Sequence, residues 1–148
     1  HDMKESKQRA KVAVRRSSAG LGLFAEEAIA KGAFIIEYTG DRINDEEAER
    51  RWKRQYLFFV HDDLCIDGTG RENTARYINH ACRPNAEPEH DEDEHRIYIY
   101  AKRNIKAGEE ITYHYGKEFF NRFIKPKGCQ CTSCQKKAAL KRPVKKKA

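Results

Sequence analysis

The sequence has no apolar run approaching the roughly 20 residues that a membrane-spanning helix needs. It also lacks an apolar leader with a small-residue cleavage site, which secretory proteins carry at their start. We therefore expect an intracellular protein without a membrane span. The first three residues, His1-Asp2-Met3, resemble a remnant of recombinant expression.

Helical signals are scarce as well. Asn44 followed by three acidic residues is typical of a helix N-terminus and predicts one short helix, capped by Asn44 and ending near Lys53. Elsewhere the apolar runs are short or alternate with period two, which predicts strands. These strands are expected at residues 11–15, 34–38, 56–60, 64–67 and 96–100. With 148 residues, 39% of them hydrophobic, the chain has material for one modest core and predicts a single, mainly β domain.

Two segments of the chain match each other. Residues 25–40 and 101–116 share Ala, Ile, Gly, Ile and Gly at a constant offset of 76. The match predicts that the same strand-turn-strand motif occurs twice. The matching segments are too short to indicate a repeat architecture. In the first copy, we expect the turn at Gly32 to join a pair of strands.

The cysteines do not suit a disulfide framework, because there are five of them. Three lie within six residues near the end of the chain, and a fourth lies 47 residues upstream. Four thiolates are the ligands that tetrahedral Zn²⁺ prefers, which predicts a zinc site in a reducing compartment. Its ligands are Cys82, Cys129, Cys131 and Cys134. Cys65, in the apolar segment 64–67, is predicted to be a small buried hydrophobic residue.

Positive charge is concentrated at one end. The chain carries +7 overall, yet eleven Lys and Arg and only one acidic residue lie from Lys117 onward. The remainder is slightly acidic, with Asp62-Asp63 and six acidic residues between Glu87 and Glu94. We expect the acidic body to attract a basic peptide and residues 136–147 to contact phosphates. A solvated face and a disordered tail are the simpler alternatives.

The segment Gly20-Leu21-Gly22-Leu23-Phe24-Ala25 has two interpretations. It satisfies the fingerprint G-x-G-x-x-A, which is typical of NAD-binding proteins. A parallel crossover needs a dozen or more residues, however, and only nine separate Gly22 from Gly32. No further strand-helix-strand unit follows, which disfavours the NAD-binding interpretation. Glycines also let the backbone approach a ligand closely.

Five motifs occur in a telling order along the chain. They are Ser18-Ala19-Gly20-Leu21-Gly22-Leu23-Phe24-Ala25, Glu37-Tyr38-Thr39-Gly40-Asp41, Asn79-His80-x-Cys82-x-Pro84-Asn85, Glu110-Ile111-Thr112-Tyr113-His114-Tyr115-Gly116 and the cysteines at 129–134. Over residues 11–135 the sequence resembles SET-domain protein lysine methyltransferases with a cysteine-bearing post-SET segment. The resemblance implies a β-clip-like fold of several small sheets, in which segment 79–80 threads like a pseudoknot under the loop around Tyr113–Tyr115.

The resemblance also implies the ligands. It implies S-adenosylmethionine as cofactor, S-adenosylhomocysteine as product, and Zn²⁺ in the post-SET segment. The cofactor-binding residues that it implies are Ala19, Gly20, Leu21, Gly22, Tyr56, Arg76, Asn79, His80, Tyr115 and Gln130.

Three tyrosines are the implied catalytic residues. Tyr115 is expected to orient the reacting groups, Tyr38 to line the lysine channel, and Tyr113 to hold a water where a more methylated amine would fit. This arrangement implies mainly monomethylation, with dimethylation as the alternative. A lysine must lose its proton (reference pKa about 10.4) before it attacks, and a narrow apolar channel disfavours its ammonium form. The displacement is direct, so alignment, desolvation and phenol hydrogen bonds are expected to supply the catalysis.

The sequence departs from the family pattern in the tail. Two residues, Thr132 and Ser133, separate the last two cysteines where many relatives have four, and His114 replaces the usual Asp between the tyrosines. Cys-x-x-Cys is still good zinc spacing. We divide the chain into a flexible arm (1–10), the SET domain (11–117), the post-SET zinc segment (118–135) and a disordered basic tail (136–148).

The implied substrate is a lysine of a histone or another basic, chromatin-like protein, held between residues 56–67 and the zinc-bound tail. The basic tail is a possible nucleic-acid contact. The implied location is the nucleus in a eukaryote or an infected host, and otherwise a bacterial cytoplasm. The alternative function is a catalytically silent, zinc-stabilised adaptor for chromatin or nucleic acid. Intact Tyr38, Asn79, His80 and Tyr115 favour the enzyme.

Overall fold

The computed structural model of the protein describes residues 7–53, 55–117, 124–129, 131 and 133–135. Short strands dominate this part of the chain, together with the helix α1 (Asp45–Arg50) and the 3₁₀ helices η1 (Thr74–Tyr77) and η3 (Lys125–Lys127). The strands are β1 (Val12–Ser17), β2 (Gly20–Ala25), β3 (Phe34–Tyr38), β4 (Asp41–Ile43), β5 (Leu57–His61), β6 (Leu64–Asp67), β7 (Asn79–His80), β8 (Ala86–Asp91), β9 (Arg96–Ala101) and β10 (Glu110–Tyr113).

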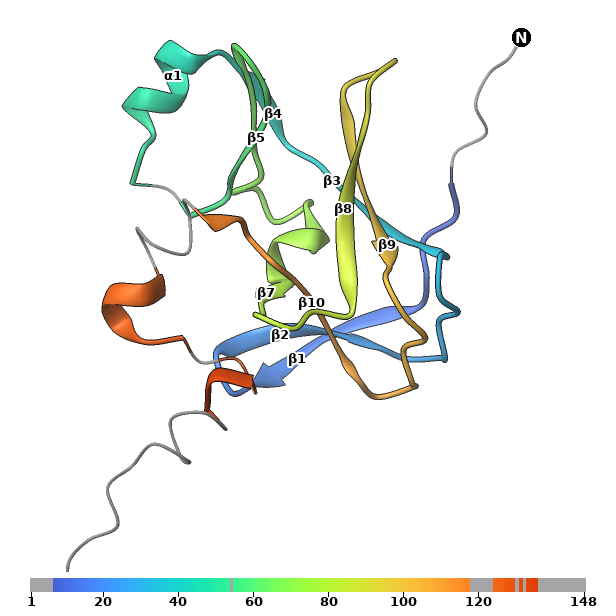
Figure 1. Ribbon diagram of the computed structural model, residues 1–148. Coiled ribbons are helices and arrows are strands. Elements are labelled where there is room, and N and C mark those ends of the chain that lie inside the picture. Colours follow the sequence, from blue (N-terminus) through green and yellow to red (C-terminus); the bar gives the residue numbers. More distant parts are fainter. Residues whose placement is uncertain (1–6, 54, 118–123, 130, 132, 136–148) are drawn as a thin grey trace, which may run out of the picture.

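The strands form three small sheets. Their orders are β1-β2-β10-β7, β3-β9-β8 and β4-β6-β5. In Figure 1 the long β8–β9 hairpin stands beside the β4–β5 region, and the β1–β2 hairpin lies below both. The late strand β10 pairs antiparallel with β2 and parallel with β7, so it unites segments from the start and middle of the chain. The parallel pair places segment 79–80 alongside Thr112–Tyr113, as the resemblance implies.

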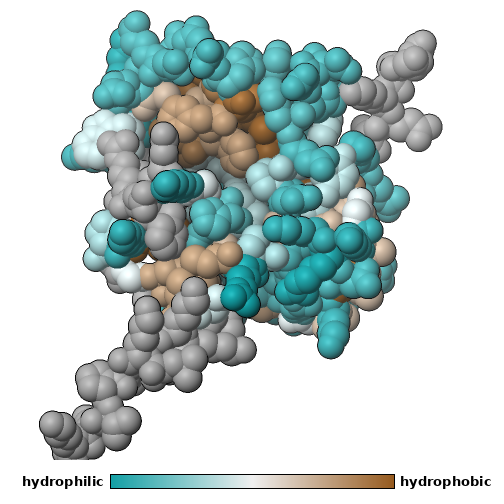
Figure 2. Space-filling view, viewed as in Figure 1, coloured by the Kyte–Doolittle hydropathy of each residue, from teal (hydrophilic) through white to brown (hydrophobic). Residues whose placement is uncertain are grey.

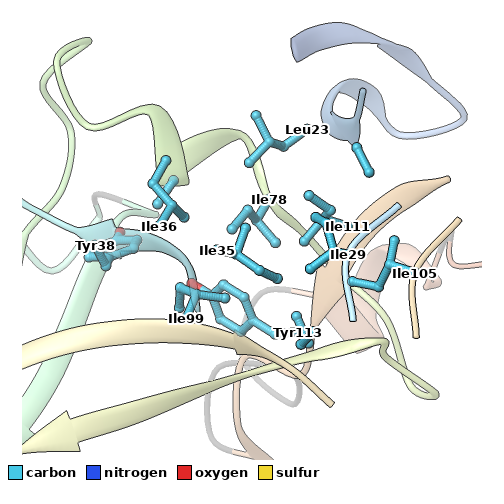
Figure 3. Packing of buried hydrophobic residues seen from close by; sticks show 14 of the residues in the cluster. Leu23, Ile29, Ile35, Ile36, Tyr38, Ile78, Ile99, Ile105, Ile111 and Tyr113 are labelled. Carbon is cyan, nitrogen blue, oxygen red and sulfur yellow. The ribbon is translucent and has the colours of Figure 1, made fainter. Parts of the chain in front are cut away.

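One apolar core lies where the sheets meet. Leu23, Ile35, Ile99 and Ile111 are fully buried, and each comes from a different strand. Figure 3 shows their side chains converging with Tyr38 and Tyr113 at one side of the cluster. Two tyrosines that the sequence marks as catalytic therefore stand on the wall of the core.

The two matching segments contact each other. Ile29 and Ile105 form a reciprocal backbone bridge, with both N–H···O distances at 2.8 Å. The Gly32 N–H donates to the Ala101 carbonyl (2.8 Å), and the equivalent Gly108 N–H donates to Ala25 (2.7 Å). Exchanging the segments maps each contact onto the other, so they meet about a local two-fold axis. Gly32 and Gly108 also share a positive φ, at 85° and 86°.

The predicted elements can be compared with the observed ones. β3 and β6 have the predicted bounds, and β1, β5 and β9 differ by one or two residues at their ends. The Asn44 cap is confirmed, because its side chain accepts a bond from the Glu47 N–H (2.9 Å), but α1 ends at Arg50 and not near Lys53. The strand pair expected around Gly32 was wrong: β3 pairs with β9 and β1 with β2.

The glycine-rich segment is a strand and not a dinucleotide turn. Residues 20–25 are β2 itself, and β2 pairs antiparallel with β1 through a tight turn at Ser18–Ala19. No crossover helix follows β2 in the described chain, so the NAD-binding interpretation is wrong. No helix in the described part is long and apolar enough to cross a membrane.

Candidate active site

A small cavity opens where β3, β5 and β10 approach one another. Its volume is ≈ 30 Å³, which admits one or two water molecules. Five of its lining residues are aromatic and three are not. They are Tyr38, Gln55, Tyr56, Leu57, Phe58, Arg76, Tyr113 and Tyr115. The narrow aromatic space suits a small group, such as the amine end of an extended alkyl chain.

The aromatic rings form a continuous wall. Tyr38 lies 5.3 Å from Phe58 between ring centroids, Phe58 lies 6.5 Å from Tyr113, and Tyr113 lies 5.1 Å from Tyr115. The Tyr38 hydroxyl donates to the Tyr56 carbonyl at 2.7 Å, and the Tyr115 hydroxyl donates to the Ile78 carbonyl. Both phenols are therefore fixed by backbone acceptors.

The cavity keeps its phenols protonated. Burial, and then the neighbouring tyrosines, raise the pKa of Tyr38 and of Tyr113 above the ordinary value, and burial raises the pKa of Tyr115. At neutral pH the three hydroxyls are thus neutral hydrogen-bond donors. The same desolvation disfavours an ammonium group, so an amine entering this space is driven toward its neutral, nucleophilic form.

Arg76 carries an unused donor at the cavity. Its guanidinium lies 4.5 Å from the centre of the Tyr56 ring, and Nη1 donates to the Thr69 carbonyl at 2.5 Å. Its Nε is buried and has no hydrogen-bond partner among the described residues. A buried, unpaired donor is costly, so its position fits a ligand that brings an acceptor.

Asn79 ties the β1–β2 turn to the site. Its side-chain amide donates to the Leu21 carbonyl (2.9 Å), to Ser17 Oγ (3.1 Å) and to Glu110 Oε2 (2.8 Å). Gly20, at the start of β2, has φ +105° and open space where a Cβ would stand. The turn and the first residues of β2 thus offer backbone groups to a ligand beside Asn79.

Gly22 is needed for close packing. A Cβ on this residue would lie 2.4 Å from Glu110 Oε2 and 3.1 Å from Ser17 Cβ. Its lack of a side chain lets the Glu110 carboxylate reach Asn79, so the glycine serves the site through this contact.

His80 connects the cavity to the cysteines. Its Nδ1 accepts the Tyr115 N–H (3.1 Å), so the ring proton sits on Nε2, which lies 3.5 Å from Cys82 Sγ. Burial and then the nearby His114 lower the pKa of His80 to about 4, which leaves a neutral ring at neutral pH. A neutral imidazole with its proton on Nε2 donates to the sulfur and holds the Tyr115 backbone.

The four predicted zinc ligands come together. The Sγ atoms of Cys82, Cys129, Cys131 and Cys134 all lie within 4.8 Å of one another, and the Cys82 and Cys134 sulfurs are 3.4 Å apart. Zn–S bonds of about 2.3 Å in a tetrahedron would place sulfurs about 3.8 Å apart. The sulfur spacing and donor type fit Zn²⁺.

Backbone N–H groups prepare one sulfur for a metal. Cys131 Sγ accepts from the Cys82 N–H (3.5 Å) and the Cys134 N–H (3.4 Å). Burial acts to raise its pKa, but these bonds lower the pKa of Cys131 to about 7. Burial raises the pKa of Cys82 well above the ordinary value and that of Cys129 to about 11. A bound Zn²⁺ would supply the charge that deprotonates these two.

An exposed strand lies next to the cavity mouth. β5 is an edge of the β4-β6-β5 sheet, and its Phe59 is 63% exposed. Figure 2 shows an apolar patch in the region of β4 and β5. The predicted acidic cluster forms β8 and the tip of the β8–β9 hairpin. Arg42 of β4 donates to the Glu94 and His95 carbonyls (3.0 and 2.8 Å), which holds this tip against the β4-β6-β5 sheet.

The predicted residues fall into three linked groups. The cavity brings together Tyr38, Tyr56, Arg76, Tyr113 and Tyr115. Asn79 joins Leu21 and the β1–β2 turn, and His80 joins Tyr115 to the cysteine cluster. Gln130 and the basic tail (136–148) lie outside the described residues.

Sequence reasoning missed some members of the site. Phe58 and Gln55 line the cavity, and Asn85 binds β10 from the β7–β8 connection. Phe58 lies two residues after Tyr56, and side chains two residues apart in a strand face the same side. This spacing could have placed Phe58 beside Tyr56 from the sequence. Cys65 is fully buried and burial raises its pKa to about 11, which confirms its prediction as a packing residue.

Comparison with known proteins gives a consistent picture. Residues 20–116 match the SET domain family. The chain is 39% identical over 140 residues to the histone-lysine N-methyltransferase ASHH3 of Arabidopsis thaliana, covering 86% of this chain and 38% of that protein. It is 46% identical over 104 residues to the histone-lysine N-methyltransferase set1 of Dictyostelium discoideum, covering 64% and 7%.

A solved structure agrees with these sequences. The humanized mutant of the Chaetomium thermophilum Polycomb Repressive Complex 2 bound to the inhibitor GSK343 is similar, with a TM-score of 0.68 and 39% identity. The similarity covers 74% of this chain and 15% of that one. This chain thus spans well under half the length of each of these relatives.

Proposed function

We propose that this chain, which belongs to the SET-domain family, is an S-adenosylmethionine-dependent protein lysine N-methyltransferase. The observation that carries the proposal is the aromatic cavity walled by Tyr38, Phe58, Tyr113 and Tyr115. Its protonated phenols and low polarity suit a deprotonated lysine amine. Relatives named histone-lysine N-methyltransferases support the same reaction.

The cofactor would lie between the β1–β2 turn and the cavity. Residues Ala19–Gly22 would hold its amino-acid end, with Asn79 and His80 supporting that backbone. Arg76, with its unpaired Nε, and Tyr56 would contact it from the cavity wall, and Gln130 would pack beside its adenine. When bound, S-adenosylmethionine supplies an electrophilic methyl group on its sulfonium and leaves as S-adenosylhomocysteine.

The protein would act by desolvation and alignment. The lysine ammonium gives up its proton to solvent water as the cavity removes water from it, and the neutral amine then takes the methyl group. Tyr115, fixed by its bond to the Ile78 carbonyl and by His80, orients the amine. Tyr38, held by the Tyr56 carbonyl, keeps the channel narrow. No protein nucleophile is needed.

We propose Zn²⁺ as the structural ion of the post-SET segment. Cys82, Cys129, Cys131 and Cys134 would hold it. The ion would fix residues 124–135 next to His80, and thus beside the proposed cofactor site. In this division residues 11–117 form the catalytic unit and 118–135 the zinc segment.

The proposed substrate is a lysine in a histone or a similarly basic protein. The relatives' names support this class, and the acidic β8–β9 hairpin provides complementary charge. The substrate strand would pair with the β5 edge, next to the apolar patch around Phe59. Nuclear chromatin is the corresponding location, and the basic tail a further nucleic-acid contact. No observation favours a silent adaptor.

The test is mass spectrometry after incubation with S-adenosylmethionine and mixed core histones. We expect a gain of one CH₂ on a histone lysine, absent without cofactor and strongly reduced in Tyr115→Phe. The matched control is Tyr77→Phe, which changes a tyrosine outside the cavity lining and should keep activity. Bound cofactor without methyl transfer to histones or to the chain's own lysines would contradict the proposal.

A further inference from the structure

An aromatic cluster lies on the outer face of the β3-β9-β8 sheet. Phe34 meets Tyr98 at 5.7 Å and 83°, and Tyr100 at 5.9 Å and 70°, between ring centroids and planes. Tyr98 and Tyr100 alternate along β9 with Ile97 and Ile99, which are buried. The three rings therefore face away from the core and from the cavity that it borders.

The cluster surrounds a lysine of the N-terminal arm. The Lys7 Nζ lies over Phe34, Tyr98 and Tyr100, at 5.7, 5.4 and 5.5 Å from the ring centres. The arm is held next to β3, because the Ala10 N–H donates to the Ile35 carbonyl at 2.8 Å (Figure 1). Three rings around one cation, with Phe34 steeply inclined to both tyrosines, form an aromatic cage.

The dimensions of this cage exceed those that a bare ammonium needs. A methyl carbon stands about 1.5 Å from its nitrogen, and carbon atoms in contact are about 3.5–4.0 Å apart. Methyl groups on the nitrogen would thus touch rings whose centres lie about 5–5.5 Å away. The distances to Tyr98 and Tyr100, 5.4 and 5.5 Å, fall within that range, and the distance to Phe34, 5.7 Å, lies just beyond it. Methylation also weakens hydration of the cation, which favours transfer onto aromatic faces.

Charge around the cage favours a cation as well. Glu87 stands opposite Tyr100 and Glu89 opposite Tyr98 in the β8–β9 register. Glu37 lies near Tyr98 and forms an ion pair with Arg96 at 3.4 Å. Carboxylates on two sides of the rings add attraction for a positive head group without filling the cage.

We propose that Phe34, Tyr98 and Tyr100 form a binding site for a methylated lysine of a protein partner, with Lys7 as an intramolecular competitor. The arm that carries Lys7 lies at the edge of the sheet, so its displacement leaves the sheet intact. The site is separate from the transfer cavity, and its ligand binding does not depend on catalysis. One domain would then recognise methyl-lysine on one face and methylate lysine on another.

The test is an NMR titration of the full chain with Nα-acetyl-Nε-trimethyllysine amide, following the ring resonances of the cage. Lys7→Gln should tighten binding several-fold, because it frees the site in every molecule. Lys11→Gln is the matched control, four residues further along the chain. Lys11 pairs with Glu27 at 3.3 Å outside the cage, so this variant should bind the ligand with the affinity of the unchanged protein.

Ring variants made in the Lys7→Gln background complete the test. Tyr98→Leu should weaken binding about tenfold, the effect of about 1.4 kcal/mol of cation–π attraction. Tyr98→Phe keeps the ring and should bind normally, which separates loss of the ring from loss of folding. A neutral isostere, with carbon replacing the charged nitrogen, should bind more weakly. Equal binding of the isostere, or shifts confined to Tyr113 and Tyr115, would overturn the proposal.

Discussion

Tyr113 is buried on the cavity wall, with its ring centroid 5.1 Å from that of Tyr115, and the cavity has a volume of ≈ 30 Å³. A water bound there would occupy the room that a second methyl group needs. We predict that Tyr113→Phe shifts the products from mono- toward di- and trimethyl-lysine, because the phenyl ring cannot hold that water. Tandem mass spectrometry of the product peptide measures the ratio. Tyr100→Phe, on β9 and outside the cavity lining, is the control, and an unchanged ratio in Tyr113→Phe would refute the idea.

Asp67 is a buried charge that anchors α1. Its Oδ2 accepts Arg51 Nη1 at 2.8 Å, and its Oδ1 accepts the Thr69 N–H at 3.1 Å. We predict that Asp67→Asn lowers the free energy of unfolding by about 1–3 kcal/mol, because half-buried Arg51 loses its buried partner and keeps only its ion pairs with Glu47 and Asp41. Chemical denaturation measures this difference.

Asp41 gives the matched control for that change. It lies 3.5 Å from the same Arg51 Nη1, but its side chain is 77% exposed. Asp41→Asn should change stability by less than about 0.5 kcal/mol, because exposed ion pairs contribute little. An equal loss of unfolding free energy in the two variants would show that the burial of Asp67 does not determine how much its ion pair with Arg51 stabilises the protein.

Asn85 acts between elements. Its side-chain amide donates to the Glu110 carbonyl (2.8 Å) and its Oδ1 accepts the Thr112 N–H (2.9 Å), so it takes the place of a strand beside β10. We predict that Asn85→Ala lowers both stability, by about 1–3 kcal/mol, and methyl transfer, because β10 carries Tyr113. Thermal unfolding and initial rates measure the two effects.

Asn85→Asp separates hydrogen bonding from size. It keeps the shape of the side chain but removes the donor, and it places a charge near Glu109 Oε2, which accepts from the present amide at 3.1 Å. This variant should be at least as impaired as Asn85→Ala. Wild-type behaviour of Asn85→Asp would show that the amide donor does not hold β10.

Elements with a local signal were predictable from the sequence. β3 and β6 are short apolar runs, and α1 begins at a capping residue, so their positions follow from nearby residues alone. β2 is not among the strands predicted from the sequence, because its glycines favour turns, and its pairing with β1 and β10 makes it a strand. β8 carries Pro88 and several acids, which an edge strand tolerates. β7 has two residues, and its partner lies more than 30 positions away.

The residues of the candidate site also divide into those that a local sequence signal predicts and those that it does not. The cysteine cluster was predictable, because the donor type and spacing of its members define a metal site without reference to the rest of the fold. The tyrosines required the family resemblance, since a pair of aromatics on one face of a strand is usually part of a core. The unpaired Arg76 Nε and the cage around Lys7 depend on side-chain placement, which no sequence pattern encodes.

At the scale of the whole molecule, the proposed metal joins the last described residues to the middle of the chain. We predict one zinc ion per chain by elemental analysis, lost in Cys134→Ser and after treatment with a strong chelator. Its loss should lower methyl transfer and the melting temperature, because His80 and Tyr115 are connected to Cys82. The far-ultraviolet spectrum should persist, since the apolar core lies within residues 23–113.

The control for metal loss is Cys65→Ala. Cys65 is fully buried in a second, smaller apolar cluster with Ile43 and Ala48, and it takes no part in the metal group. It should retain one zinc ion while losing some packing stability. A metal-free wild-type protein with full activity would contradict the structural role that we propose for zinc.

The place of β10 in the sheets has a consequence for biosynthesis. Strands β2 and β7 leave the ribosome long before residues 110–113. The edges of both strands that pair with β10 therefore stay without a partner until β10 emerges. Open edges invite pairing with other chains, and a growing chain passes through that stage on every round of translation. Tyr113 and Tyr115 arrive with the strand that closes those edges. We therefore expect a translation product that stops short of residue 110 to lack both tyrosines and to leave the edges of β2 and β7 unpaired, which favours aggregation.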